Sequence, residues 1–268
     1  MPTTLGAALR VHELPEHLEW LHQYGGRDLE IQDPCYPGVL EGDWRKTVQE
    51  ARAMLEGHGG CVGVHGAYDG LELASFDPVV QGFVRERHRQ SLEFAGALGA
   101  THLVIHSPFA FFGQSAHRSD TGLAQELERV HATLEPLLQV ASDIGCAFVI
   151  ETIQDLEPAP LLALVRSFDS PLVRLSVDVG HVQLMMARGG VMPSEWLLEG
   201  ADVLAHLHLQ DNDGLFDRHW ACGNGSVDWA AVLRVLEHVP SAPRAILEVS
   251  PGDLPHAAAH LVGTGLAV

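Results

Sequence analysis

The sequence has little of several features that mark particular classes of protein. It holds only four cysteines in 268 residues, Cys35, Cys61, Cys146 and Cys222, and none lies at the paired spacing of a zinc ribbon or a redox motif. Lys and Arg together number 16, against 35 Asp and Glu, so the formal net charge is −19. Nucleic-acid backbones are bound through clustered Lys and Arg, and because this chain has no basic run, general nucleic-acid binding is disfavoured.

Long apolar runs are also absent. No stretch has the length and apolar purity of a membrane span, and the N-terminus lacks the basic start and long apolar centre of a secretion signal. No linker or low-complexity segment interrupts the chain. We therefore expect a soluble, cytoplasmic protein that does not act at membranes. We also expect residues 1–268 to form one domain, because an α/β barrel commonly uses about 250 residues as a single unit.

The most informative feature that is present is a set of short apolar runs, each of which ends in a histidine or an acidic residue. Such runs are typical of parallel strands that are covered on both faces, where a polar residue is tolerated mainly at the point at which the strand leaves the core. The runs end at His65, His106, Glu151, Asp178, His208 and Glu248, with a weaker first case at His12.

These runs alternate with segments of helical periodicity. The predicted strands cover residues 4–10, 28–32, 61–65, 101–106, 147–151, 173–178, 203–209 and 244–249. The predicted helices cover residues 44–58, 79–99 and 123–145, with weaker ones at 14–24, 158–167, 195–200, 228–238 and 254–262. Eight strands that alternate with helices predict a closed parallel (β/α)8 barrel, a TIM barrel. An open doubly wound sheet usually carries a glycine-rich turn after its first strand, and this chain has ALRVHE there.

In such a barrel the C-terminal ends of the strands surround one pocket, so the polar residues that end the runs should meet there. Imidazole with carboxylate is the ligand mixture of zinc, manganese, iron or cobalt, and it is too rich in nitrogen for a magnesium or calcium cage. His181, Asp217 and His219 lie in the loops that follow the sixth and seventh strands. A lone His at a strand end is more often only hydrogen-bonded, and a lone acid often caps a helix, so the prediction of a metal site depends on the agreement of several runs.

Seven segments together resemble the xylose-isomerase-like TIM barrel superfamily. They are HGAY (65–68), IHSP (105–108), IETIQD (150–155), DVGH (178–181), HLHLQDNDG (206–214), DRHWACGNGSVDW (217–229) and ILE (246–248). This superfamily includes sugar and sugar phosphate isomerases and epimerases, inosose dehydratase-like enzymes, and the AP (abasic-site) endonucleases of the endonuclease IV type, AP endonuclease family 2. The joint order of the segments is a specific signal, although each one alone is weak.

The resemblance implies a set of metal ligands. Glu151, Asp178, His208 and Glu248 match the four ligands of the sugar epimerases, and the same four match ligands in the endonuclease branch. In that branch further metals are held by residues that correspond to His65, His106, His181, Asp217 and His219, and all nine positions are filled here. The resemblance therefore implies a divalent metal cofactor, zinc, manganese, cobalt or iron, and leaves one, two or three ions open.

Other residues are candidates for the substrate pocket. We expect His12, Tyr68, Asp211 and Arg218 to bind substrate, and Glu30 is a weaker candidate of the same kind. His206 lies two residues before His208 on the same strand, so it points the same way one layer deeper, where we expect a core residue or one that supports the ligands. In the epimerases an Arg binds substrate a short step beyond the position of His208, whereas the nearest here is the more distant Arg218.

The resemblance implies an enzyme that interconverts carbohydrates. In the epimerases the residues that match Glu151 and Glu248 are metal ligands that also serve as acid and base, and proton transfer passes through a metal-stabilised enediolate. We therefore expect a small-molecule substrate, a sugar, sugar phosphate or related polyol. The alternative is a multinuclear-metal phosphoesterase that resembles the endonuclease IV type, and a metal-bearing binding module without catalysis is a third reading. A homo-oligomer is also compatible with a barrel of this size.

Overall fold

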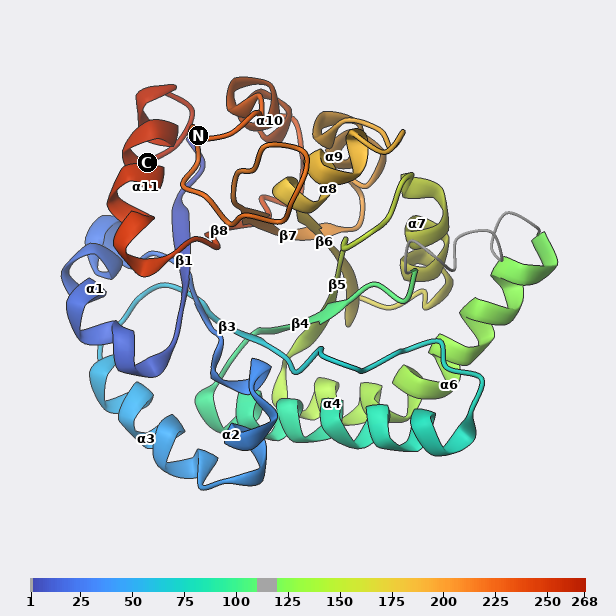
Figure 1. The fold of residues 1–268 in the computed structure, drawn as a ribbon. Helices are drawn as coiled ribbons and strands as arrows, with labels where there is room; N and C mark the ends of the chain where they lie inside the picture. Colours follow the sequence, from blue (N-terminus) through green and yellow to red (C-terminus); the bar gives the residue numbers. More distant parts are fainter. Residues whose placement is uncertain (1, 110–119) are drawn as a thin grey trace.

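The structure is a computed structural model that describes residues 2–109 and 120–268, and its strands close into one barrel (Figure 1). The strands follow one another around the barrel in chain order, and β8 pairs with β1 in parallel. They are β1 (Leu5–Leu9), β2 (Leu29–Ile31), β3 (Val62–His65), β4 (His102–His106), β5 (Ala147–Glu151), β6 (Val173–Asp178), β7 (Leu204–Leu209) and β8 (Arg244–Leu247). This arrangement confirms the predicted (β/α)8 TIM barrel.

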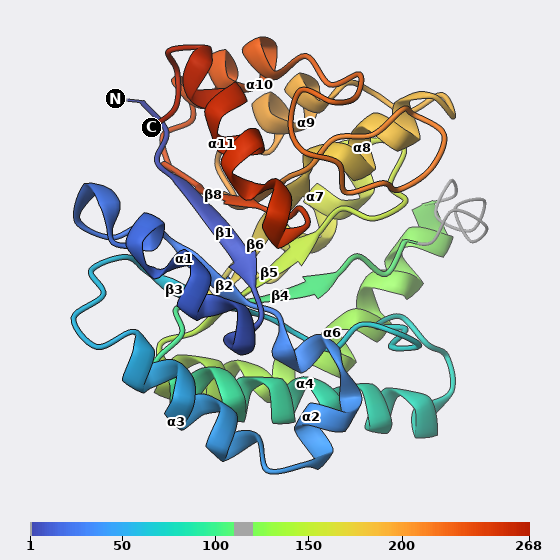
Figure 2. The same ribbon diagram turned by 60° about the vertical axis from the view of Figure 1, so that its left-hand side comes forward.

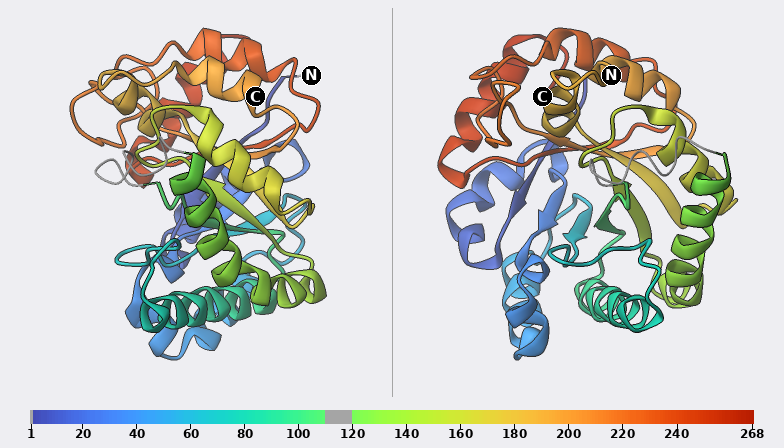
Figure 3. Two further views of the ribbon diagram at one scale, coloured as in Figure 1. Left: turned by 90° about the vertical axis from the view of Figure 1, so that its right-hand side faces the viewer. Right: turned by 45° about the vertical axis from the view of Figure 1, so that its right-hand side comes forward.

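Helices form a ring around the strands, as the right-hand view of Figure 3 shows. They are α1 (Leu14–Leu21), α2 (Pro37–Glu41), α3 (Trp44–Met54), α4 (Pro78–Leu98), α6 (Asp120–Ile144), α7 (Pro158–Ser167), α8 (Val179–Met186), α9 (Pro193–Glu199), α10 (Trp229–Leu236) and α11 (Leu254–Gly263). The predicted helices agree with these to within a few residues, but α2 and α8 were not predicted. Helix α8 begins directly at the end of β6, where the Asp178 side chain accepts a hydrogen bond from the His181 N–H and caps the helix.

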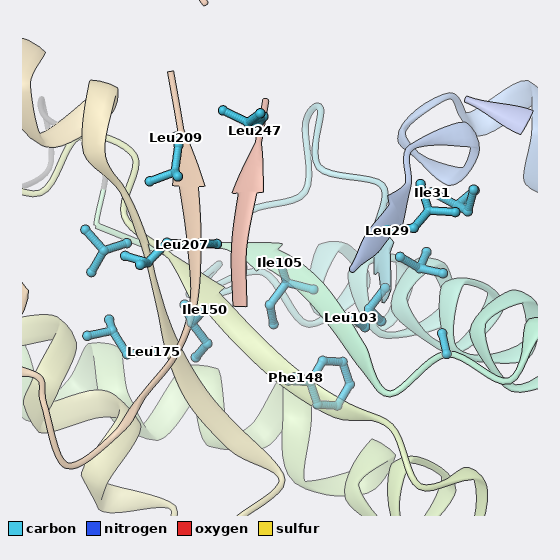
Figure 4. Close-up of a cluster of buried hydrophobic side chains, with 14 of the residues drawn as sticks. Leu29, Ile31, Leu103, Ile105, Phe148, Ile150, Leu175, Leu207, Leu209 and Leu247 are labelled. Atoms are coloured by element: carbon cyan, nitrogen blue, oxygen red, sulfur yellow. The ribbon is translucent and has the colours of Figure 1, made fainter. Parts of the chain in front are cut away.

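Along the strands, apolar side chains that face the helices alternate with side chains that face the interior of the barrel, and most of these inner side chains are polar or small. Figure 4 shows part of the apolar set, which comes from β2 and from β4 to β8 and is fully buried. The inner set includes His206 and His208 on β7, which alternate with Leu207 and Leu209. His208 Nε2 reaches Glu30 Oε1 of β2, at 3.0 Å, which requires that both side chains point into the barrel.

This alternation corrects the expectation that the strands are apolar on both faces. The runs on β4 and β5 are continuously apolar in sequence because Val104 and Val149 occupy inner positions on these strands, beside the polar residues of the inner face. The main hydrophobic core lies instead between the barrel wall and the helices, where residues such as Phe148 and Ile150 have no exposed surface. The interior of the barrel is therefore left free for charged and hydrogen-bonding groups.

The polar residues that were predicted at strand ends lie at or next to the C-terminal ends of the strands, with one exception. Those in place are His65, His106, Glu151, Asp178, His208 and Glu248. The exception is His12, because β1 ends at Leu9 and His12 lies in a 3-10 turn, Val11–Glu13. Glu13 Oε2 accepts a hydrogen bond of 2.7 Å from the Arg10 N–H, which starts the turn directly after the strand.

The seam between β1 and β8 is extended by the two ends of the described chain, which lie side by side in Figure 2. Thr3 and Ala267 form a β-bridge, and the Leu5 N–H donates a hydrogen bond of 3.0 Å to the Val268 carbonyl. All four cysteines are free thiols, so no disulfide contributes to the fold. Of the helices within residues 2–109 and 120–268, none combines the length and the apolar character needed to cross a bilayer.

The position of the core predicts where truncation of a side chain is costly. Phe148 on β5 is fully buried, so we expect Phe148→Ala to lower the free energy of unfolding by about 3–5 kcal/mol. Phe76 is 85% exposed and provides the matched control; Phe76→Ala should change the free energy of unfolding by less than about 0.5 kcal/mol. Chemical denaturation followed by circular dichroism measures both variants, and equal effects would contradict this description of the core.

Candidate metal centre

Four of the predicted ligands, from four consecutive strands, meet at the mouth of the barrel. Glu151, Asp178 and His208 lie on β5, β6 and β7, and Glu248 follows β8 directly. One ligand atom from each residue lies within 4.8 Å of the other three. His208 Nδ1 is 2.9 Å from Glu151 Oε1 and 3.4 Å from Glu248 Oε2. We call these four residues the central group.

Glu151 also belongs to a second cluster, the β3–β4 group (His65, His106 and Glu151). Its Oε2 atom is 3.4 Å from His65 Nε2 and 3.7 Å from His106 Nε2. The other oxygen, Oε1, faces His208 Nδ1 and is 3.6 Å from His181 Nδ1. The Glu151 carboxylate therefore lies between two sets of imidazoles and directs one oxygen at each.

A third cluster, the loop group, consists of His181, Asp217 and His219. His181 lies in the first turn of α8, whereas Asp217 and His219 lie in the long loop between β7 and α10. Asp217 Oδ2 is 3.2 Å from the Nε2 atom of each histidine. The fold thus brings all nine predicted ligands into three adjoining groups.

The orientation of four histidine rings turns one nitrogen of each toward the carboxylate of another candidate ligand. In each ring the other nitrogen donates to a fixed acceptor. For three rings this nitrogen is Nδ1 and the acceptor is a backbone carbonyl: His65 donates to Gly66 (2.9 Å), His181 to Thr152 (2.9 Å) and His219 to Glu248 (3.0 Å). His208 instead donates from Nε2 to Glu30 Oε1 (3.0 Å). Histidines that bind metals are oriented in the same way, by a hydrogen bond from the nitrogen that does not bind the ion.

The electrostatics of the centre reflect charges that are buried close together. Burial by itself would raise the pKa of Glu151, but the surrounding histidines, His208 foremost, hold this pKa well below its usual value. Burial, together with the nearby carboxylates of Glu151 and Glu248, raises the pKa of Asp178 to about 6. Burial lowers the pKa of His106 to about 3, so this imidazole is neutral and the lone pair of one ring nitrogen can bind a metal ion.

Two carboxylate oxygens show that the central group fits a cation. Glu151 Oε2 and Asp178 Oδ2 are buried and make no hydrogen bond to any described residue. A buried carboxylate oxygen without a partner is costly unless a positive ion compensates it. The mixture of imidazole nitrogen and carboxylate oxygen suits zinc, manganese, iron or cobalt. The residues present therefore fit the divalent metal that the sequence predicted.

Two residues that were predicted to bind substrate, Tyr68 and His12, have different surroundings. The Tyr68 ring stacks on His106 with ring centroids 4.3 Å apart, which places it beside the β3–β4 group. The His12 side chain is 64% exposed and lies 3.9 Å from Glu13, its neighbour in the 3-10 turn. A role in substrate binding stays a prediction for both residues.

Arg218 lies in the same loop as two ligands of the loop group. Its guanidinium is 3.2 Å from Asp213 and lies over the rings of Phe216 and Trp220. The Arg218 side chain is 39% exposed, and exposed ion pairs contribute only about 0–1 kcal/mol. Arg218 can therefore exchange Asp213 for an anionic group of a substrate, and its predicted role stays open to test.

Asp211 does not line the pocket, contrary to the prediction. Its side chain is fully buried, and its carboxylate accepts hydrogen bonds from the N–H groups of Asn212, Gly223 and Val227 and from the Trp229 indole. These donors come from both ends of the loop that carries the loop group. Asp211 therefore fixes the path of this loop and has no free oxygen to offer to a substrate.

Sequence reasoning did not identify two amides that contact the ligands. Gln32, directly after β2, donates a hydrogen bond of 2.8 Å to Glu248 Oε1. Gln210, directly after β7, donates to Asp178 Oδ1 (3.2 Å) and to Asp217 Oδ1 (3.0 Å), so it joins the central group to the loop group. Both glutamines lie at the ends of predicted strands, so the rule that found the ligands could have found them too.

The hydrogen bonds of Asp211 predict an effect on metal affinity without direct contact with the metal. We expect Asp211→Ala to weaken zinc binding at the loop group by about 10–100-fold, because its loss frees Asp217 and His219 to move. Zinc titration of the chelated protein measures this change. Asp228→Ala, which removes only the N-cap of α10, is the control and should leave zinc affinity unchanged. Similar losses in the two variants would show that Asp211 has no special role.

Comparison with known proteins agrees with the fold. The model of the family described as xylose isomerase-like TIM barrel matches residues 18–263. The structure of a D-tagatose 3-epimerase-like protein is similar, with a TM-score of 0.79 over 98% of this chain and 97% of that chain, at 20% sequence identity. The TTHB071 protein from Thermus thermophilus, in a crystal soaked with ZnCl2, has a TM-score of 0.74 over 98% of both chains, at 25% identity.

A curated relative matches a shorter part of the chain. The uncharacterized protein MJ1311 of Methanocaldococcus jannaschii is 24% identical over 185 residues, which cover 66% of this chain and 60% of that protein. The chain thus spans about three fifths of the length of the curated relatives that it matches. The family model, in contrast, covers most of the chain and includes every ligand of the three groups. The chain belongs to the xylose isomerase-like TIM barrel family.

Proposed function

We propose that this protein is a metal-dependent isomerase or epimerase that acts on a sugar, a sugar phosphate or a related polyol. The observation that carries the proposal is the pair of carboxylates in the central group. Glu151 and Glu248 reach His208 Nδ1 from β5 and from the end of β8. Isomerisation beside a carbonyl needs one group that removes a proton from carbon and one that returns it. The two carboxylates supply both groups at one site.

The two carboxylates differ in their access to the mouth of the barrel. The Glu248 side chain is 12% exposed, and Gln32 fixes one of its oxygens. The Glu151 side chain is 1% exposed and is surrounded by imidazoles. We therefore assign Glu248 to proton transfer on the open side of the substrate and Glu151 to the inner side.

The other two residues of the central group would hold the metal ion. His208 is fixed by Glu30, and Asp178 accepts hydrogen bonds from the His181 N–H (2.6 Å) and from Gln210 (3.2 Å), so neither ligand is free to move. A divalent cation held there would stabilise the negative charge that develops on the substrate oxygens during enolisation. The chain's own contribution is to keep both carboxylates in a fixed relation to the reacting carbon.

The surroundings of the centre suit a small, polar substrate. Tyr68 and Trp220 are 43% and 37% exposed, and aromatic rings of this kind pack against the C–H faces of sugars. Arg218, over the Trp220 ring, is positioned to meet an anionic substituent such as a phosphate. Membership of the xylose isomerase-like family supports a carbohydrate substrate, as does the likeness in fold to a D-tagatose 3-epimerase-like protein.

One observation favours a second function, the hydrolysis of a phosphate ester. Glu151 directs Oε1 at the central group and Oε2 at His65 and His106, so its carboxylate is placed to be shared by two cations. Adjacent cations that stabilise both the attacking and the leaving oxygen are typical of hydrolytic sites. The net charge of −19 disfavours a nucleic-acid polymer and leaves a small phosphate ester as the substrate of this second candidate.

A single set of assays separates the two functions. Protein loaded with zinc, manganese or cobalt is incubated in D2O with a panel of ketoses and ketose phosphates, and deuterium bound to carbon is measured by NMR. We expect deuterium incorporation beside the carbonyl of at least one substrate. The same preparations are assayed with bis(p-nitrophenyl) phosphate and with a duplex that contains an abasic site. Hydrolysis of either ester without hydrogen exchange would replace the proposed function by the second one.

Amide substitutions test the roles of the two carboxylates. We expect Glu248→Gln and Glu151→Gln each to lower the rate of hydrogen exchange by about 100- to 10,000-fold, because an amide cannot accept the proton. The metal content of each variant is measured as well, since both residues are ligands. Glu50→Gln, on the surface of α3, is the control and should exchange at the unchanged rate. A metal-loaded Glu248→Gln protein with near-normal exchange would exclude Glu248 as the acid or base.

A further inference from the structure

A second cluster of potential ligands lies beneath the central group, inside the barrel. This deep group consists of Glu30 on β2, His102 on β4 and His206 on β7, which are 0%, 5% and 0% exposed. His206 Nε2 is 3.2 Å from Glu30 Oε2, and His102 Nε2 is 3.9 Å from the same oxygen. The three ligand atoms all lie within 4.8 Å of one another. None of these residues belongs to the nine ligands of the mouth.

The three atoms that converge in the deep group make no hydrogen bonds. Glu30 Oε2, His102 Nε2 and His206 Nε2 are all buried and unpartnered within the described chain. The opposite end of each side chain is anchored: His206 Nδ1 lies 2.8 Å from Ser176 Oγ, His102 Nδ1 lies 3.2 Å from Thr101 Oγ1, and Glu30 Oε1 accepts from His208. The Nδ1 atom of each ring faces a hydroxyl that can accept a hydrogen bond, so the Nε2 atom of each ring is turned toward the Glu30 oxygen. This is the orientation that histidines adopt around a metal ion.

Space and charge also favour an ion in this position. Gly63 on β3 faces the His102 ring, and a Cβ at residue 63 would lie 2.0 Å from His102 Nε2, so the ring is accommodated only because a glycine stands there. Glu30 Oε1 is paired with His208, but Glu30 Oε2 faces the two deep imidazoles without a hydrogen bond. A buried carboxylate oxygen without a partner is costly unless a cation compensates it.

A cavity lies next to one residue of the deep group. A cavity of about 310 Å³ at the N-terminal end of the barrel is lined by His102 and Thr101, on the side opposite the mouth. Two arginines also line this cavity; Arg244 is paired with Asp28 at 2.8 Å, and Arg174 donates a hydrogen bond to the Asp202 carbonyl. Positive charge along this cavity slows the passage of a cation, so exchange of an ion at the deep group should be slow.

We propose that the deep group is a second metal site, which binds one divalent transition metal ion such as zinc or iron(II) inside the barrel. Two imidazoles and one carboxylate are an established ligand set for these ions. Ligand atoms about 2.1 Å from a tetrahedral zinc ion lie about 3.4 Å apart, close to the separations of 3.2 and 3.9 Å that involve Glu30 Oε2. The ion compensates the charge of Glu30, which in turn orients His208 of the central group. This inference does not depend on the proposed function.

Metal counting tests the proposal. Zinc-loaded protein, freed of excess metal, is analysed for zinc per folded chain by mass spectrometry of the element. We expect His102→Gln to bind one zinc ion fewer than the wild type. His88→Gln is the matched control, because His88 on α4 is equally buried but faces no other ligand, and it should keep the wild-type count. A folded His102→Gln protein with the wild-type count would overturn the proposal.

Anomalous diffraction from crystals of the zinc-loaded wild type gives a second reading that requires no variant. We expect a peak at the zinc absorption edge between Glu30, His102 and His206. Peaks confined to the mouth of the barrel would overturn the proposal. Both measurements count or locate ions, so failure of the protein to act on sugars leaves this inference intact. Failure of the deep site to bind zinc likewise leaves the proposed function untouched.

Discussion

The carboxylate of Glu151 is the element on which the rest of the centre depends. A charge with almost no access to water must be compensated by its neighbours, and Glu151 lies 2.9–3.7 Å from histidines of β3, β4 and β7 and of the start of α8. No single strand could supply these partners. The closed barrel can, because it directs the ends of all its strands at one point. The three candidate metal groups adjoin one another because Glu151 belongs to two of them and contacts the third.

The pleat of the strands divides the molecule into two environments. Residues such as Phe148 and Leu207 point outward and form the apolar core with the helices. Their neighbours in sequence point inward and carry the ligands, in two layers. His208 lies in the upper layer and His206 in the lower one, and Glu30 contacts both of them. The period of two along β7 therefore sets the spacing between the mouth and the deep group.

Much of this structure follows from the sequence, and the exceptions have physical causes. The strand-end rule found the candidate ligands on the strands because a polar residue after an apolar run marks the edge of the core, as Asp178 and Glu151 illustrate. It failed for His12, because a 3-10 turn begins before that residue. The separate expectation that Asp211 lines the substrate pocket failed because its partners come from a loop whose path no local pattern specifies. The deep group was not predicted because His102 stands at the start of an apolar run, whereas the rule considered only the residue at the end. In addition, a run that is interpreted as buried on both faces does not indicate which of its residues face the interior of the barrel.

The division between an apolar outer face and a polar inner face has an evolutionary consequence. A substitution at the mouth, such as one at His65 or Asp217, removes no side chain from the hydrophobic core, so lineages can exchange ligands while the barrel stays folded. The candidate ligands and the residues that stabilise the fold therefore lie on opposite faces of the same eight strands.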